Sequence, residues 1–368
     1  MRSNNVVGIV FSNTSDKSLP ELTSNRTMAS VPIGGKYRAI DFTLSNFSNS
    51  GINNVCIIAN KNFISLMDHV GSGKAWDLSK RRSGLSVLPP YDGKDNSNML
   101  EMIYNIKDYL EQCNEEYVLI CNSNFITNVD YTELFDFYEE KKAEAVLVYT
   151  NVKAPDGIER PMVIKKDEND KVEQVFITPD VKGVCPITLG TLLVSKKILF
   201  DMITDSLSKN ETNEKIFIRS MTQKHNTYAF ENKGYCATIT SMKEYFNVNM
   251  DLMDAEVRKE LFQSERPIYT KVRDDTPCQY GLSSSVKHSL ISQGCVIKGT
   301  VENCVLSKGV YIDEGAVVKN SIIMQDTKIG KDVNLNYVVI DKDVIVNDGR
   351  SLMGYESYPV YISKKSNV

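Results

Sequence analysis

Residues 6–16 read VVGIVFSNTSD, and this stretch decides the class of fold. Val6–Phe11 is an apolar, β-branched run, typical of a strand buried on both faces of a parallel sheet. In doubly wound folds the loop after such a strand surrounds a ligand's phosphates, and it uses glycines because a Cβ would block close approach. The loop Asn13-Thr14-Ser15-Asp16 has no glycine, and Asp16 brings a carboxylate. We interpret it as an ordinary strand-to-helix turn whose polar side chains bond to its own backbone.

The first two thirds of the chain alternate apolar runs with amphipathic stretches, a pattern that predicts an α/β fold. The expected strands are Val6–Phe11, Val55–Ala59, Tyr117–Cys121, Ala145–Tyr149 and Leu189–Val194. The expected helices are Ala39–Ser50, Asn98–Cys113, Tyr131–Lys142, Lys196–Leu207 and Met242–Leu261.

After Gly281 the periodicity changes. Short apolar clusters such as Cys295–Ile297 and Val344–Val346 alternate with turn pairs such as Lys308-Gly309. Their spacing predicts a stacked β-helix with coils of roughly 16–18 residues. We therefore expect a domain over residues 1–262, a linker over 263–281 and a solenoid over 282–368. Because a solenoid exposes sheet edges and an apolar face, oligomerisation is its favoured role.

Composition excludes several classes of protein. The net charge of −4 over 368 residues gives no basic excess for nucleic acid. No uninterrupted apolar run is long enough to span a bilayer, so we expect no membrane association. The eight cysteines form no CxxC pair, which argues against a zinc site and fits reduced thiols in the cytoplasm.

A longer stretch carries a family resemblance. Residues 31–51, VPIGGKYRAIDFTLSNFSNSG, and residues 71–78, GSGKAWDL, resemble the bacterial glucose-1-phosphate adenylyltransferases (ADP-glucose pyrophosphorylases). The resemblance implies an N-terminal Rossmann-like (GT-A-like) nucleotidyltransferase domain with a mixed sheet. It also implies that the C-terminal solenoid is a left-handed β-helix of the hexapeptide type.

The catalytic positions of that family are changed in this chain. Asn13 and Thr14 stand in the phosphate loop, Ser18 replaces its arginine, and Met28 replaces the lysine that follows. The family binds Mg²⁺ through two carboxylates, whose matching positions here are Asn124 and Thr238. The comparison therefore predicts no bound metal, no other cofactor and no catalytic residue.

Three further family features are also altered. Asn98 begins the segment that corresponds to a Gly-Thr-Ala of the nucleotide pocket, and Thr178 replaces the lysine that holds the sugar phosphate. Asn60 replaces a glutamine that reads adenine, and its amide could still hydrogen-bond. Six changes at unrelated points of the sequence predict that the site no longer catalyses nucleotidyl transfer.

A basic cluster is retained beside a glycine turn: Gly34, Gly35, Lys36 and Arg38. Two roles are open for it. It could bind a phosphorylated sugar effector, or its cations could pair with Asp41 or cap backbone carbonyls.

The retained scaffold and the lost site together resemble the D-type regulatory subunits of the family. That resemblance implies a catalytically inactive subunit that assembles with a catalytic subunit into a hetero-oligomer, expected to be a tetramer. The alternatives are a weakly active adenylyltransferase, a free-standing sugar-phosphate or nucleotide sensor, and a hexapeptide acyltransferase. The last would need a general base, for which the solenoid offers only His288.

Overall fold

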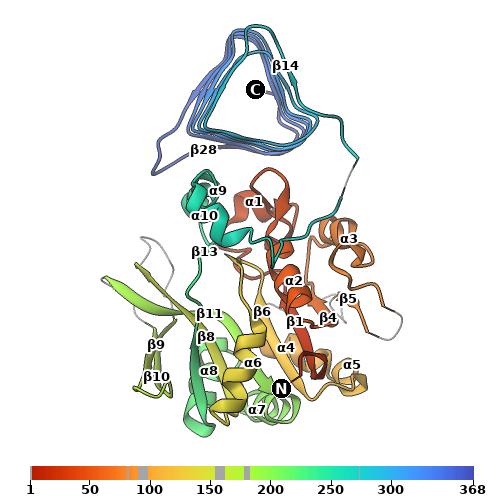
Figure 1. Cartoon of the computed structure of the whole chain (residues 1–368), viewed down its shortest axis with the longest axis vertical. Helices are drawn as coiled ribbons and strands as arrows, with labels where there is room; N and C mark the ends of the chain where they lie inside the picture. The colour runs from red at the N-terminus through yellow and green to blue at the C-terminus, as the bar shows by residue number, and fades with distance from the viewer. Residues whose placement is uncertain (1, 81–82, 90–97, 154–161, 178–182, 273) are drawn as a thin grey trace.

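The computed structural model describes residues 2–80, 83–89, 98–153, 162–177, 183–272 and 274–368. An N-terminal α/β domain is followed by a triangular solenoid that lies over helices α1, α9 and α10 (Figure 1). Thr178 lies outside the described residues.

A mixed nine-stranded sheet forms the centre of the N-terminal domain, in the order β10-β9-β11-β6-β1-β4-β5, with β8 pairing to β11 and β12. β1 pairs in parallel with both β4 and β6, whereas β11 runs antiparallel to β6. The strands are β1 (Val6–Phe11), β4 (Asn54–Ile58), β5 (Leu85–Leu88), β6 (Tyr117–Asn122), β8 (Ala145–Lys153), β9 (Met162–Lys166), β10 (Val172–Ile177), β11 (Val184–Ser195) and β12 (Thr227–Glu231). Two ribbons pair outside it, β2 (Pro32–Ile33) with β3 (Tyr37–Arg38) and β7 (Phe125–Thr127) with β13 (Cys236–Thr238).

The described helices cover both faces of this sheet, except α1, α9 and α10, which lie between the sheet and the solenoid. They are α1 (Pro20–Thr23), α2 (Ala39–Asn49), α3 (Ile64–Val70), α4 (Met99–Asn105), α5 (Lys107–Gln112), α6 (Tyr131–Glu140), α7 (Lys196–Ser208), α8 (Glu214–Lys224), α9 (Met242–Asp251) and α10 (Ala255–Leu261). Two expected helices, 98–113 and 242–261, are each divided in two. Ile106 leaves helical geometry between α4 and α5, and the side chain of Asp254 caps α10 by accepting from the Glu256 N–H.

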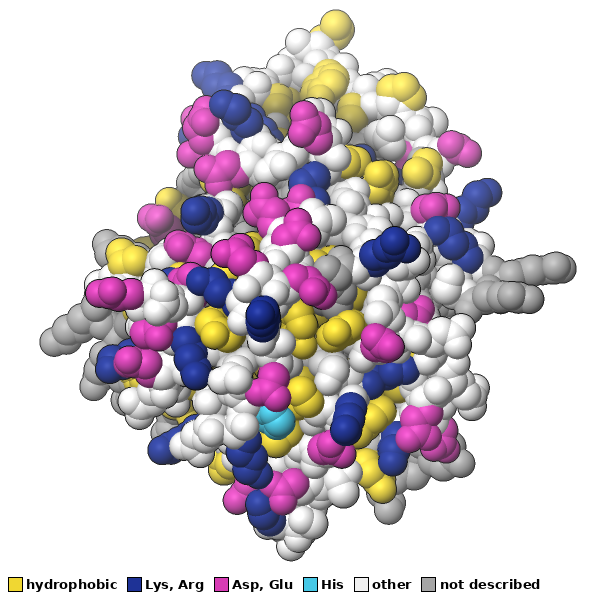
Figure 2. All heavy atoms as spheres, turned by 60° about the horizontal axis from the view of Figure 1, so that its bottom comes forward, with side chains coloured by type: hydrophobic (Ala, Val, Ile, Leu, Met, Phe, Trp, Pro, Cys, Tyr) yellow, Lys and Arg dark blue, Asp and Glu magenta, His cyan; other side chains and the backbone are white. Residues whose placement is uncertain are grey.

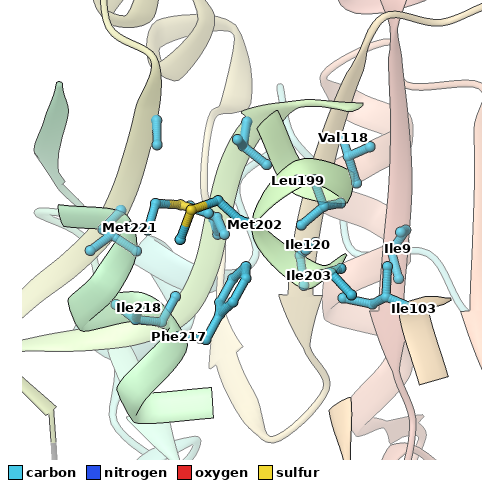
Figure 3. Close-up of a cluster of buried hydrophobic side chains, with 14 of the residues drawn as sticks. Ile9, Ile103, Val118, Ile120, Leu199, Met202, Ile203, Phe217, Ile218 and Met221 are labelled. Atoms are coloured by element: carbon cyan, nitrogen blue, oxygen red, sulfur yellow. The ribbon is translucent and has the colours of Figure 1, made fainter. Parts of the chain in front are cut away.

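Figure 3 shows the core on one face of the sheet, where α7 and α8 pack against β1 and β6. Alternate strand residues such as Ile9 and Ile120 meet Leu199 of α7 and Phe217 of α8, and all four are almost fully buried. Each such side chain contributes roughly 1.5–3 kcal/mol when it leaves water. The opposite face packs against α2, α3 and α6.

The solenoid consists of three parallel five-stranded sheets, β14-β17-β20-β23-β26, β15-β18-β21-β24-β27 and β16-β19-β22-β25-β28. In one coil Val296 pairs with Tyr311, 15 residues later; the next spacing, from Tyr311 to Lys328, is 17 residues. Its strands are β14 (Gln279–Tyr280), β15 (Ser285–Lys287), β16 (Leu290–Ile291), β17 (Val296–Ile297), β18 (Thr300–Glu302), β19 (Val305–Leu306), β20 (Tyr311–Ile312), β21 (Val317–Lys319), β22 (Ile322–Ile323), β23 (Lys328–Ile329), β24 (Asn334–Asn336), β25 (Val338–Ile340), β26 (Ile345–Val346), β27 (Ser351–Met353) and β28 (Val360–Ile362).

One corner of the solenoid carries an asparagine ladder, formed by Asn303, Asn320 and Asn336. Asn303 Nδ2 donates to Asn320 Oδ1 at 2.6 Å, and Asn320 Nδ2 donates to Asn336 Oδ1 at 2.8 Å. Asn303 and Asn320 have positive φ, which asparagine tolerates better than most residues. The ladder holds successive coils in register. His288, at the start of the same corner, bonds to Asn303 Oδ1 at 3.0 Å.

An apolar interface joins the two domains. Leu19, Met28 and Val31 of the first domain pack in one cluster with Val305 and Ile322 of the solenoid. A buried ion pair lies beside them: Arg26 Nη2 donates to both oxygens of Asp341, at 2.7 and 2.9 Å. β14 starts at Gln279, inside the segment 263–281 expected to be a linker.

Lysines and arginines are interspersed with acidic side chains over the face that Figure 2 shows. None of the described helices is long and apolar enough to cross a membrane.

Candidate functional site

The carboxyl ends of β1, β4 and β6 open into a cleft, the usual ligand position in an α/β sheet. Two cavities make up this cleft, one of about 400 Å³ and one of about 360 Å³. The loop at 13–18 and Asn60 line the first cavity; Asn124 and Thr238 line the second. Asn122 and Glu214 line both cavities.

The loop after β1 is held by its own side chains. Asn13 Oδ1 accepts from the backbone N–H of Asn60 at 2.8 Å, and Asn13 Nδ2 donates to the Lys61 carbonyl at 3.1 Å. Thr14 Oγ1 donates to Asn122 Oδ1 at 3.1 Å. These bonds tie the loop to the ends of β4 and β6. Within the loop, the backbone N–H groups of Asp16 and Ser18 donate to the carbonyls of Asn13 and Ser15.

Asp16 is directed into the loop. Its side chain is buried, and Oδ1 accepts from the backbone N–H of Met28 at 2.8 Å, while Oδ2 accepts from Asn13 Nδ2 at 2.6 Å. The carboxylate therefore stabilises the turn. Ser15, which precedes it, has a φ of 65°, so the left-handed position of this loop is occupied without a glycine.

The two positions expected for metal carboxylates lie together. Asn124 Nδ2 contacts Thr238 Oγ1 at 3.4 Å and Ser15 Oγ at 3.3 Å, and Thr238 lies on β13 opposite Phe125. An amide and a hydroxyl supply no negative charge, whereas Mg²⁺ sites in proteins are built on one or two carboxylates. Within the described ranges no group of three or more His, Cys, Asp or Glu could hold a metal ion. The residues present therefore do not fit the cation.

Carboxylates line the second cavity at other points: Glu214, Glu244 and Asp251. Burial is the largest cause that raises the pKa of each of these three carboxyl groups. Glu244 Oε2 accepts from the N–H and the hydroxyl of Thr240, at 2.7 and 2.6 Å, and its Oε1 has no hydrogen-bond partner among the described residues. A phosphate would meet like charge here where these carboxyl groups are ionised.

Sequence reasoning missed these acids. Glu214 begins α8, a helix that the pattern did not predict, although Asn213 before it is a preferred N-cap residue and bonds to the Lys215 N–H.

Other expected site residues have structural roles. Asn98 caps α4 by accepting from the Leu100 N–H at 3.0 Å. Met28 is fully buried in the interdomain cluster, Ser18 is exposed, and Asn60 lines the cleft.

The glycine turn lies in the β2–β3 hairpin and touches the solenoid. Gly34 and Gly35 have φ values of 58° and 74°. A Cβ on Gly35 would come within 2.8 Å of the Leu306 carbonyl oxygen, so only glycine lets the hairpin press against the solenoid backbone.

A basic pocket lies between this hairpin and the solenoid, with a volume of about 50 Å³. Its basic lining residues are Lys36, Arg38, His69, Lys271, Lys308 and Lys342. We call it the interdomain basic pocket. Only Lys36 and Arg38 of this set were predicted from the sequence. The others come from distant segments that meet only in the folded chain.

Arg38 belongs both to the pocket and to the scaffold. Its Nη1 donates to the Ser65 carbonyl at 2.7 Å and to the Ser65 hydroxyl at 3.0 Å, so a carbonyl is capped as the structural alternative expected. Asp41 accepts instead from the Arg38 backbone N–H at 3.0 Å and lies 2.5 Å from His69 Nε2.

Two groups of the pocket have shifted pKa values. Burial, together with the Arg38 and Arg26 guanidinium groups, lowers the pKa of Lys342 to about 7. Burial also lowers the pKa of His69 below its usual value, against the opposing effect of Asp41. At neutral pH the imidazole is therefore mainly uncharged, and Lys342 lies near its titration midpoint.

Comparison with known proteins decides the family. The nucleotidyl transferase family matches residues 7–255, and the GlmU-like C-terminal hexapeptide family matches residues 276–357. A glucose-1-phosphate adenylyltransferase of Clostridium perfringens is 31% identical over 89% of this chain and 87% of its own length. The chain belongs to the glucose-1-phosphate adenylyltransferase family. Within that family, the glycogen biosynthesis protein GlgD of Bacillus subtilis is 30% identical over 99% of this chain and 97% of its own.

These family matches confirm the expected fold. The mixed sheet is that of a nucleotidyltransferase domain, and the three parallel sheets form a left-handed β-helix of the hexapeptide type.

Proposed function

We propose that this chain is a regulatory, catalytically inactive subunit of a glucose-1-phosphate adenylyltransferase, and that it acts in glycogen biosynthesis. The observation that carries the proposal is the contact between Asn124 and Thr238, a neutral pair where the cation would need carboxylates. The likeness to the Bacillus subtilis GlgD protein along nearly the whole chain supports it.

Transfer of a nucleotidyl group to glucose 1-phosphate requires that the negative charge on the triphosphate be neutralised. This chain offers no carboxylate pair for a cation at the matching positions. Its loop after β1 is tied by Asn13 to Asn60 and Lys61. Loss of one preorganised donor typically costs ~3–4 kcal/mol of transition-state stabilisation. Since several such groups are missing, turnover falls below detection even though such losses do not add.

The partner we propose is a catalytic subunit of the same family, in a hetero-oligomer that we expect to be a tetramer. The exposed sheets of the solenoid offer surface for such assembly. A subunit without catalytic activity can still change its partner's activity, because contacts at the subunit interface shift a conformational equilibrium. We place this activity in the cytoplasm, where the eight free cysteines would stay reduced.

The effector we propose is a phosphorylated sugar, bound in the interdomain basic pocket. Six basic side chains converge there from both domains, and lysine and arginine donors are suited to phosphate oxygens. Because the ligand would touch the hairpin and the solenoid at once, its binding would change how firmly the domains are held together.

The pocket also favours a second function, a free-standing sugar-phosphate sensor. The two proposals differ in whether the chain forms a stable complex with a catalytic homologue, which co-purification of the two chains decides.

The decisive assay measures pyrophosphate release from ATP and glucose 1-phosphate. We expect no release by this chain alone, and release by a catalytic homologue that changes in rate or effector response when this chain is added. Robust release by the purified chain alone would establish the alternative of an active adenylyltransferase.

A further inference from the structure

Lys342 is a residue of the interdomain basic pocket that follows β25 and Asp341 in the chain. Its Nζ makes no hydrogen bond or ion pair with another described residue, although Lys342 lines the pocket. Each facing element contributes positive charge: Arg38 from β3, Arg26 from the segment after α1, and Lys364 from the turn after β28. These positive charges therefore destabilise the protonated form of Lys342.

The carboxylate of Asp341, which precedes Lys342 in the chain, already accepts hydrogen bonds from other groups. Asp341 receives both bonds from Arg26, a third from the Tyr361 hydroxyl at 2.9 Å, and a fourth from the Lys342 backbone N–H at 2.7 Å. Asp341 is 2% exposed, so water does not replace these donors. Its charge stabilises the guanidinium first and is only partly available to the ammonium of Lys342.

Four other basic side chains of the pocket have partners of their own. Lys308 Nζ lies 2.7 Å from an Asp275 oxygen, and Lys271 Nζ lies 3.3 Å from one of Asp68. His69 is bound to Asp41, and Lys36 lies over the Tyr37 ring. Of these side chains, Lys342 is the one whose charged group has no hydrogen bond, ion pair or ring contact with a described residue.

We propose that a divalent anion, such as the phosphoryl group of the effector, binds in this pocket together with uptake of one proton by Lys342. This inference rests on the effector site of the proposed function and adds its regulation. The anion supplies the counter-charge that Lys342 lacks, so the ammonium form becomes favourable once the ligand is bound. By linkage, the anion then binds more weakly as pH rises.

The size of the effect follows from the pKa of about 7 in the free protein. If only the protonated form binds, the apparent affinity scales with the protonated fraction, and it falls roughly fifteenfold between pH 7.0 and pH 8.5. His69 contributes little in this range, because burial keeps its pKa below the usual value.

Sulfate is the suitable probe, since it stays a dianion throughout this range and adds no titration of its own. We would titrate the full chain with sulfate by calorimetry at pH 7.0 and 8.5, at constant ionic strength. Repeating the titration at pH 7.5 in buffers of different ionisation enthalpy measures the proton uptake, expected to be about three quarters of a proton.

Two substitutions assign the effect to Lys342. Lys342→Arg keeps the charge at all these pH values, so it should bind sulfate with little pH dependence. Lys342→Met should bind weakly at both pH values. Lys319→Met is the matched control, because this solenoid lysine pairs with Glu302 outside the pocket, and it should keep the wild-type slope.

The failures are distinguishable. Equal sulfate affinity at both pH values, or an unchanged slope in Lys342→Arg, would overturn proton uptake and leave the anion site intact. Failure to bind sulfate at either pH would overturn the effector site itself.

Discussion

Removal of one partner of the buried interdomain ion pair should lower the free energy of unfolding of the whole chain. The Arg26 and Asp341 side chains are 4% and 2% exposed, and they make two contacts of 2.7 and 2.9 Å. Arg26→Met would leave the Asp341 carboxylate with the Tyr361 hydroxyl and one backbone N–H, in a site closed to water. Breaking a buried pair from one side costs about 3–5 kcal/mol. We expect the lower end, because the nearby Lys342 can take up a proton and compensate in part.

The assay is urea unfolding followed by two signals. Fluorescence of Trp76, the single tryptophan and 1% exposed, reports on the N-terminal domain, and far-UV circular dichroism reports on both domains. The double variant Arg26→Met/Asp341→Leu should recover most of the loss, because an apolar pair of similar volume often replaces a buried ion pair at little cost. Glu302→Gln, at the exposed pair with Lys319, is the control and should not shift the transition measurably.

A free energy of unfolding for Arg26→Met within about 1 kcal/mol of wild type would refute this reasoning. It would mean that the solenoid is held on the first domain by apolar packing alone.

Three further predictions concern the cleft and the solenoid. Asn124→Asp/Thr238→Asp should create a cation site, so that Mn²⁺ raises the thermal midpoint and adds up to about 2.7 kcal/mol of stability at a hundredfold excess over Kd; equal stabilisation of wild type would contradict this. Asn320→Ala should cost about 1–3 kcal/mol in urea unfolding, because its two neighbours in the asparagine ladder lose partners; an unchanged midpoint would show the ladder to be dispensable. Because burial raises the pKa of Glu244, the folded state holds that proton more tightly, and stability falls as pH rises above the usual range of a glutamate. Glu244→Gln should therefore reduce the fall in stability as pH rises above about 4.5; an unchanged slope would exclude Glu244 as its source.

The sequence was sufficient for elements whose pattern is local. The run Val6–Phe11 gave β1 with its exact bounds, and the short apolar clusters gave a solenoid with mostly 17-residue spacing. It was insufficient for Asn98–Cys113, because nothing in an amphipathic pattern marks the non-helical backbone of Ile106. The break before α10 was visible in principle, since Asp254 is a preferred capping residue.

Some residues of the candidate site were predicted from the sequence and others were not. Asn124 and Thr238 were predicted from the family resemblance, and the structure places their side chains in contact. Lys271, Lys308 and Lys342 could not be found, because each is an ordinary lysine until the linker and the solenoid fold back onto the glycine turn. Charge that converges from distant segments leaves no local signal in a sequence.

We infer that this cleft does not bind a metal-bound triphosphate. The most direct measurement is a crystal of the chain soaked with ATP and Mg²⁺ at millimolar concentration. We predict that Asn13 and Asp16 keep their bonds within the loop and that no cation is coordinated between Asn124 and Thr238. An ordered nucleotide in the cleft, with Mg²⁺ coordinated at those two residues, would show that the cleft still binds the substrate complex.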